Sequence, residues 1–135
     1  MEIKNQWKRP EVAEYLDKGP LHEHRAGLNM ICLKVLELLL KLPEYTVLDV
    51  ACGPGSVLGR MLHKHVPIKT KQYLGIDYSL PAIKRARHNF LNYKFKKMDV
   101  VENSIPSANI IVCADLLQHL ANPEVAVENI LNLLR

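Results

Sequence analysis

The chain has 135 residues and a mass of 15.4 kDa, which is enough for one domain. Hydrophobic residues make up 48% and charged residues 24%, a composition typical of folded globular proteins that excludes general disorder. No apolar run is as long as the ~18 residues that cross a membrane, and we expect no signal peptide because the first residues have no apolar core. The three cysteines are widely spaced, which argues against a disulfide framework or a zinc knuckle and favours a cytoplasmic location.

The formal net charge of +4 is unevenly distributed along the chain. Residues 60–97 hold ten Lys or Arg and one acid, whereas residues 98–135 hold five acids and one base. A basic surface of this kind can bind nucleic acid. No pattern of stacking aromatic residues accompanies it, so we interpret it as a solvated face and keep nucleic acid as the less favoured partner.

The first third of the chain is predicted to be helical. A proline in the first turn begins a short helix at residues 10–17, and Gly19-Pro20 ends it. A longer helix is expected at 22–42, where apolar residues step by three and four and so form one buried stripe. We expect residues 1–45 to form an N-terminal helical cap on a core domain at 46–135.

Short strands and helices alternate from residue 46 onward. The strands are predicted at 46–50, 72–76, 93–98 and 108–113, and the helical segments at 56–65, 81–89, 115–120 and 122–135. This alternation is typical of an α/β fold with a doubly wound parallel sheet and helices on both faces. Lysines alternate with aromatic residues at 93–98, which suits an edge strand that discourages foreign pairing.

Acidic residues coincide with the ends of the predicted strands. Asp49, Asp77, Asp99 and Asp115 each lie at or directly after a strand end. Ligands of such sheets bind beyond the carboxyl ends of the strands, so the acids predict a ligand site there. Asp77 follows a glycine turn at the spacing at which an acid accepts hydrogen bonds from both ribose hydroxyls of a nucleoside.

Gly53 and Gly55 flank the turn between the first predicted strand and the next helix. Glycine allows the backbone to approach a ligand closely there, although a tight turn without a ligand is an alternative interpretation. A dinucleotide oxidoreductase shares these two glycines and a later acid. It is disfavoured because Leu58 stands where the third glycine of its motif belongs.

Three segments, in order, resemble the motifs of class I S-adenosylmethionine-dependent methyltransferases. They are VLDVACGPGS at 47–56, GIDYS at 75–79 and KMDV at 97–100, and the segment 110–124 is similar to the fourth strand and following helix of the small-molecule branch. The departures are mild: Ala51 replaces the usual first glycine, and Ser56 a common third one. The resemblance implies a Rossmann-like fold whose C-terminal strands are missing, with S-adenosylmethionine as cofactor and a small-molecule methyl acceptor.

The resemblance also implies roles for individual residues. The glycines would let the backbone approach the methionine part of the cofactor, and Asp49 would orient the loop amides or the cofactor's amino group. Asp77 would bind the ribose hydroxyls and Tyr78 the adenine face, while Asp99 and the Val100 amide would bind the adenine edge. The complete expected set is Asp49, Ala51, Cys52, Gly53, Pro54, Gly55, Asp77, Tyr78, Asp99, Val100, Cys113, Ala114 and Asp115.

His119 is the candidate general base. Histidine is the residue type most suited to act as a base near neutral pH, and this one lies one helical turn after Asp115. A structural interpretation stays open, in which His119 completes a short helix and Asp115 forms a capping box with Gln118.

Two His-x-His pairs invite a metal interpretation, His22 with His24 and His63 with His65. A spacing of two suits a strand rather than the helices predicted there, and no acid or cysteine cluster completes either pair. We therefore expect no metal site.

Two further alternatives concern function. A non-catalytic nucleoside-binding module is favoured by the short chain, and a nucleic-acid methyltransferase by the basic middle. The segment 113–116 carries neither the Asp/Asn-Pro-Pro-aromatic signature of adenine methylation in DNA nor the Pro-Cys pair of cytosine methylation.

The predicted strand at 110–112 (IIV) is unusually apolar for an edge. No lysine or proline guards it, and the strand that pairs with it in the resembling family would follow residue 135. We expect the 135-residue chain to self-associate through this edge, to be marginally stable and to be a poor catalyst.

Overall fold

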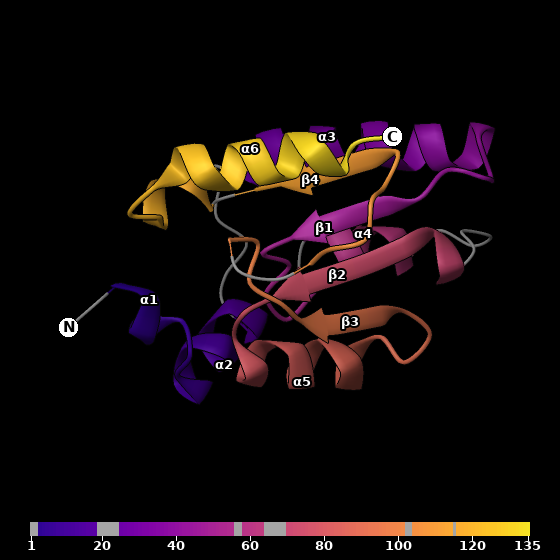
Figure 1. The fold of residues 1–135 in the computed structure, drawn as a ribbon. Helices are drawn as coiled ribbons and strands as arrows, with labels where there is room; N and C mark the ends of the chain where they lie inside the picture. Colours follow the sequence, from indigo (N-terminus) through magenta and orange to yellow (C-terminus); the bar gives the residue numbers. More distant parts are fainter. Residues whose placement is uncertain (1–2, 19–24, 56–57, 64–69, 102–103, 115) are drawn as a thin grey trace.

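A parallel sheet with helices on both faces forms the core of the chain (Figure 1). The computed structural model describes residues 3–18, 25–55, 58–63, 70–101, 104–114 and 116–135. The strands are β1 (Val47–Val50), β2 (Tyr73–Asp77), β3 (Lys94–Lys97) and β4 (Ile110–Cys113). The α-helices are α1 (Ile3–Gln6), α2 (Pro10–Lys18), α3 (Arg25–Lys41), α4 (Leu58–His63), α5 (Leu80–Asn89) and α6 (Pro123–Leu133), with 3-10 turns η1 (Thr70–Gln72) and η2 (Leu117–His119).

The sheet has the strand order β3-β2-β1-β4, and its pairings are parallel. Asp49 of β1 lies opposite Gly75 of β2 on one side and Val112 of β4 on the other. The chain runs from β1 to β2 and β3 and then returns to the other side of β1, so the topological switch point lies between β1 and β4. The predicted Rossmann-like parallel sheet is confirmed. Sheets of this kind bind ligands beyond the carboxyl ends of their strands, next to the switch point, which here is the carboxyl end of β1.

Separate apolar clusters cover the two faces of the sheet. Helices α3, α4 and α5 pack on one face, around buried residues that include Leu39, Leu62, Tyr73, Ile83 and Phe95. On the other face, α6 packs through Ala126 against Leu48 and Ile76. All four residues of β1 are buried, as an inner parallel strand between two layers requires.

The predicted elements occur in the predicted order, with small differences at their ends. The strand expected at 108–113 begins later, at Ile110, because the chain bends at Asn109, whose Oδ1 accepts a hydrogen bond from the Thr46 amide at 2.9 Å. Of the segment expected to be helical at 115–120, residues 117–119 form η2. The predicted helices at 22–42 and 56–65 extend beyond the described residues at 22–24, 56–57 and 64–65.

Strand β3 forms one edge of the sheet and is protected there. Its three lysines are exposed and Phe95 is buried, in line with the expected alternation. The backbone groups of successive residues in a strand point to opposite sides. The Met98 amide donates to the Asp77 carbonyl of β2, so the Phe95 carbonyl, three residues earlier, points away from β2 toward the outer edge. Arg87 donates to this carbonyl through Nε at 3.1 Å and Nη2 at 2.8 Å. Lysines and a guanidinium therefore cover the β3 edge.

Strand β4 forms the opposite edge, and the end of the described chain pairs with the residue Ala108 shortly before it. The Ala108 amide donates to the Leu133 carbonyl at 3.0 Å, and the Arg135 amide donates to the Ala108 carbonyl at 3.1 Å. The resulting bridge between Ala108 and Leu134 is parallel. It lies before the first residue of β4, so Ile110–Cys113 itself remains at the edge of the described sheet.

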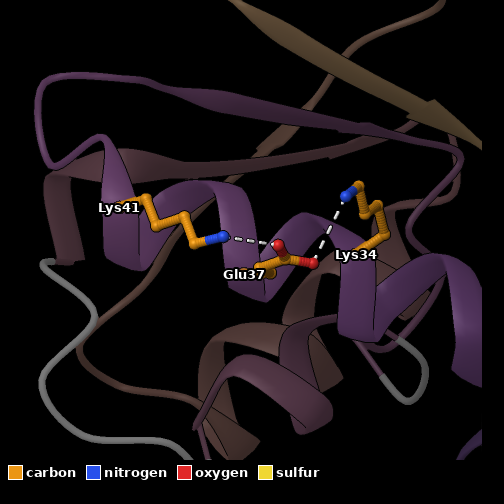
Figure 2. Close-up of polar contacts among 3 residues, drawn as sticks. All are labelled: Lys34, Glu37 and Lys41. Atoms are coloured by element: carbon orange, nitrogen blue, oxygen red, sulfur yellow. Dashed lines mark hydrogen bonds and ion pairs between the residues drawn. The ribbon is translucent and has the colours of Figure 1, made fainter.

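Helix α3 is the longest described helix, with 17 residues, and it presents a mixed outer face. Figure 2 shows Glu37 between two lysines: its Oε1 lies 2.7 Å from Lys41 Nζ and its Oε2 lies 3.3 Å from Lys34 Nζ. The hydrogen bond from Lys41, followed by that from Lys34, lowers the pKa of Glu37. Met30 and Leu40 are exposed on the same helix.

No helix in the described part of the chain has the length and apolarity needed to cross a membrane.

Gly75 provides a test of the packing between β2 and β3. A Cβ at this position would lie 2.7 Å from Phe95 Cδ1 and 2.9 Å from the Tyr73 hydroxyl, and both of these rings are buried. We expect Gly75→Ala to lower the free energy of unfolding by about 1–3 kcal/mol, because the core has no room for the methyl group. Urea denaturation measures the change.

Gly59→Ala is the matched control, since its Cβ would face the same two rings at ordinary contact distances of 3.4 and 3.8 Å. Alanine also favours the helical conformation of α4. This variant should be as stable as the parent chain or more stable. Equal destabilisation by both substitutions would contradict the packing argument.

Candidate cofactor-binding site

The turn after β1 has an unusual backbone. Ala51, Gly53 and Gly55 all have positive φ, at 58°, 56° and 77°. Glycine adopts this region freely, whereas the Cβ of alanine makes it unfavourable by roughly 1 kcal/mol. The Cys52 amide donates to the Ile76 carbonyl at 3.0 Å, which fixes the turn against the end of β2. The turn thus has the form that its glycines predict, with strain at Ala51.

The two glycines of the turn face different surroundings. A Cβ built on Gly53 meets no atom within 4 Å, so open space lies beside it. A Cβ on Gly55 would lie 3.0 Å from the ring of Phe90 and 3.4 Å from that of Phe95. Gly53 can therefore receive a ligand close to the backbone, whereas Gly55 allows the turn to pack on the protein core.

Asp77 connects this turn to the segment after β2. Its Oδ2 accepts from the Gly53 amide at 2.9 Å, and its Oδ1 accepts from the Ser79 amide at 2.8 Å. Burial raises the pKa of Asp77, while these backbone hydrogen bonds and one from Tyr78 act in the opposite direction. Each carboxylate oxygen has two lone pairs, so both retain the capacity to accept from a ligand.

Asp49 lies inside the core below the turn. It is 6% exposed, and its Oδ2 accepts from the hydroxyl of Tyr73 at 2.7 Å. Burial raises the pKa of Asp49 to about 7, the Tyr73 hydroxyl lowers it, and the negative charge of Asp77 raises it further. Tyr73 was not among the site residues predicted from the sequence. The pattern that could have indicated it is a tyrosine at the start of β2, two residues before a glycine. Because Gly75 lies opposite Asp49 and has no side chain, the Tyr73 ring has space to reach Asp49.

The two cysteines of the predicted site are not nucleophiles in this setting. Cys52 is buried, and burial, followed by the charges of Asp49 and Asp77, raises its thiol pKa well above the ordinary value. Burial likewise raises the thiol pKa of the half-buried Cys113, with a smaller effect from Asp49. Both thiols are therefore neutral near pH 7 and act as apolar lining.

The remaining predicted residues lie around the same end of the sheet. Pro54 is buried and Tyr78 is half-buried, and burial is the main cause of a raised pKa of Tyr78. Asp99 Oδ1 accepts from the Val101 amide at 3.0 Å, and the carbonyl of buried Val100 accepts from Asn129 Nδ2 of α6 at 3.0 Å. Ala114 follows β4 and is partly buried. Asp115 lies outside the described residues.

The N-terminal helices contact both flanks of the site. The Trp7 ring, between α1 and α2, packs on His119 after β4, with ring centroids 4.8 Å apart. Helix α2 lies against α5, where Glu14 Oε2 is 3.7 Å from Arg85 Nη2. In Figure 1, α1 and α2 lie on the side toward which the strand arrows point. The N-terminal segment therefore reaches from the segment after β4 to the helix after β2, on the side of the carboxyl ends of the strands.

The histidine pairs do not form a described metal centre. His22, His24 and His65 fall outside the described residues. Within the described ranges, no three His, Cys, Asp or Glu side chains lie close enough together to hold a metal ion.

The raised pKa of Asp49 makes stability depend on pH. An unfolded aspartate has a pKa of ~3.9, so the folded chain holds an extra proton between about pH 4 and about pH 7. The stabilisation from the protonated form is complete below this range and is lost as the pH rises through it. An asparagine side chain does not titrate, so Asp49→Asn should gain stability relative to the parent chain on going from pH 5 to pH 8.

Urea denaturation at the two pH values measures this gain. Glu44→Gln, which changes an exposed carboxylate, is the control and should show no comparable gain. A difference between Asp49→Asn and the parent chain that stays the same at both pH values would disprove the assignment.

Comparison with known proteins extends these observations. A model of the methyltransferase domain family matches residues 48–135. The ubiquinone biosynthesis O-methyltransferase of Coxiella burnetii is 31% identical over 116 residues, which cover 82% of this chain and 46% of the relative. The enzyme of the same name from Nitrosomonas europaea is 26% identical over 86% of this chain and 49% of its own length. The chain thus spans about half the length of these relatives.

Solved structures show the same fold. The magnesium protoporphyrin IX methyltransferase from Synechocystis, solved with bound S-adenosylmethionine, aligns with a TM-score of 0.65 and 16% identity over 99% of this chain and 73% of that one. An N-methyltransferase from Bradyrhizobium japonicum, solved with S-adenosylhomocysteine, aligns with a TM-score of 0.61 and 20% identity over 98% and 66% of the two chains. With its parallel sheet, its glycine turn and the family match over residues 48–135, this chain belongs to the class I S-adenosylmethionine-dependent methyltransferase family.

Proposed function

We propose that this chain binds S-adenosylmethionine at the carboxyl ends of β1, β2 and β3 and takes part in methyl transfer to a small-molecule acceptor. The observation that carries the proposal is the hydrogen bond between the Gly53 amide and Asp77, which brings the glycine turn and the acid of β2 together. The relatives' names, which describe O-methyltransferases, support a small-molecule acceptor.

The residues present fit this cofactor. Open space beside Gly53 leaves room for a ligand against the turn, and Asp77 has lone pairs free for two ribose hydroxyls. Tyr78, Asp99 and the Val100 amide would hold the adenine ring. A bound S-adenosylmethionine supplies a methyl group that is already activated on a sulfonium sulfur. The protein then has to align the acceptor and receive its proton.

Two residues would respond to the charges of this reaction: Asp49 would balance the positive charge of the cofactor, and His119 would accept the proton of the methyl acceptor. Asp49, with its pKa raised to about 7, would ionise fully when a cationic cofactor binds above it, because a nearby positive charge favours the carboxylate. His119 would act as the general base, since it lies after β4 beside the N-terminal segment. We also propose a cytoplasmic location, which is supported by three cysteines that are all free thiols.

Asp77→Ala tests the cofactor site. A hydrogen bond to a charged group contributes ~1.5–3 kcal/mol, so the dissociation constant for S-adenosylmethionine should rise ten-fold or more. Calorimetry measures the constant, with NAD as a second ligand that we expect not to bind. Glu44→Ala removes an exposed carboxylate and should leave affinity unchanged. Unchanged affinity in Asp77→Ala, or a preference for NAD, would refute the proposal.

We further propose that copies of the 135-residue chain associate through the β4 edge. Exposed apolar residues occur on the helices of both faces of the sheet: Met30 on α3 is 73% exposed and Leu131 on α6 is 61% exposed. The two apolar clusters assign these helices to opposite faces of the sheet, and Figure 1 draws α6 in front of α3, both next to β4. An unguarded edge between apolar helices favours pairing with an identical edge.

Sedimentation equilibrium tests the association. We expect dimers of the parent chain, and we expect Leu131→Glu to weaken dimerisation at least ten-fold by placing a charge at the interface. Leu91→Glu is the control, because Leu91 is 84% exposed between α5 and β3, on the opposite side of the sheet. A monomeric parent chain, or equal effects of both substitutions, would show that β4 is not an interface.

A further inference from the structure

Tyr73 and Asp49 form a buried pair that connects β2 to β1. Tyr73 is 1% exposed, and its hydroxyl donates to Asp49 Oδ2 at 2.7 Å. Within the described residues, this is the one hydrogen bond that the Asp49 carboxyl group makes. A buried carboxylate needs several donors, because burial removes the water that would otherwise solvate its charge. A single hydroxyl therefore stabilises the ionised form of Asp49 only in part.

The groups that act on Asp49 from the surrounding elements are negative or neutral. Beyond burial and the hydroxyl bond, the charge of Asp77 at the end of β2 raises the pKa of Asp49. The thiols that interact with Asp49 are neutral, and they belong to Cys32 in α3, Cys52 in the turn after β1 and Cys113 in β4. Among the described residues, no Lys, Arg or His forms an ion pair with either aspartate. The described protein thus supplies no cation to these two carboxyl groups.

A ligand bound against the glycine turn can act on Asp49 through its charge. Asp49 lies one residue before the end of β1, and Gly53 in the turn that follows borders open space. Charges interact more strongly through a protein interior than through water, because the interior screens them less. S-adenosylmethionine carries a sulfonium charge, whereas S-adenosylhomocysteine, the product left after methyl transfer, has a neutral sulfur. The two ligands thus differ at this site by one methyl group and one positive charge.

We propose that Asp49, supported by the Tyr73 hydroxyl, lets this site distinguish the charged cofactor from its neutral product. The inference rests on the proposed function, because it concerns the selectivity of that same site. When the cation binds, the O–H bond of the protonated Asp49 breaks, its electron pair stays on the carboxylate, and the proton passes to the solvent. Methyl transfer removes the sulfonium charge, and the carboxylate then takes a proton back from the solvent. The product is therefore bound less tightly than the cofactor, which favours its release.

Calorimetry at pH 6, in two buffers of different ionisation enthalpy, measures the protons released when each ligand binds. Burial raises the pKa of Asp49 to about 7, so most chains hold this proton at pH 6, and S-adenosylmethionine should release roughly 0.5–0.9 proton per chain. S-adenosylhomocysteine should release less than half as much. Asp49→Asn keeps the shape of the side chain and should abolish this difference, and it also corrects for protons that the ligands themselves exchange. Equal release by both ligands in the parent chain would refute the inference.

Tyr73→Phe gives a second test, because it keeps the buried ring and removes the hydroxyl. Asp49 then loses its donor and ionises at higher pH, so S-adenosylmethionine should release at least twice as many protons at pH 7.5 as it does from the parent chain. Tyr93→Phe is the matched control, since it removes a hydroxyl from a buried ring whose centroid lies 5.0 Å from that of Tyr73. This control should behave like the parent chain. A purely structural role of Tyr73 would weaken both ligands equally and leave proton release unchanged, which would contradict the inference.

A measurement without ligand separates this inference from the proposed function. Carbon-13 NMR of the aspartate carboxyl groups follows the titration of Asp49 in the free chain, and Asp49→Asn identifies its resonance. We expect a midpoint at about pH 7 in the parent chain and a higher one in Tyr73→Phe. A midpoint at the ordinary value of ~3.9 would overturn the inference whatever the chain binds. A chain in which Asp49 titrates as expected, but which does not bind S-adenosylmethionine, would refute the proposed function and with it the selectivity.

Discussion

The carboxylate of Asp77 joins two segments that lie 24 residues apart, and the geometry of the whole site depends on this link. One oxygen holds the Gly53 amide of the turn after β1, and the other holds the Ser79 amide that begins the turn into α5. Without it, the positive-φ turn would have to be fixed mainly by the bond from Cys52 to Ile76. A parallel sheet brings strand ends together, and a charged hydrogen bond then sets their spacing.

A second buried carboxylate lies directly below this link. Asp49 depends on one hydroxyl, that of Tyr73, and its own pKa near 7 shows that the interior tolerates the negative charge poorly. Asp77 contributes to this because two carboxylates in one region disfavour each other's ionisation. The site therefore holds more negative charge than its donors stabilise, a condition that a positively charged ligand would relieve.

Much of the fold could be predicted from residue patterns, because short apolar runs and glycine or proline breaks are local signals. The order of strands and the acids at their ends follow from such signals. The partner of Asp49 could not be predicted, because the reach of Tyr73 depends on strand register and on the absence of a side chain at Gly75. The different surroundings of the two glycines could not be predicted either. Gly53 borders open space and Gly55 packs on Phe90, and this depends on where Phe90 lies in the fold.

The same limit explains why the meeting of Trp7 and His119 could not be predicted. These residues lie near opposite ends of the chain, and no periodicity connects a loop tryptophan to a histidine after the fourth strand. The chemistry of His119 makes it a candidate by itself, whereas its neighbour becomes visible only when the N-terminal helices are placed on the sheet. The type of a residue predicts which chemistry it can perform. Which distant residue it contacts depends on how the elements pack, and this cannot be predicted from local patterns.

The hydrogen bonds from Arg87 to the Phe95 carbonyl affect how many copies of the chain can join by pairing their sheet edges. A sheet can polymerise only if both of its edges accept a new strand, since each added copy must present a free edge to the next. Here Arg87 covers the Phe95 carbonyl of the β3 edge and exposed lysines flank it, so this edge is a poor acceptor of a further strand. If copies of the chain pair along β4, the charged β3 edges at the two ends of the joined sheet disfavour further growth by strand addition.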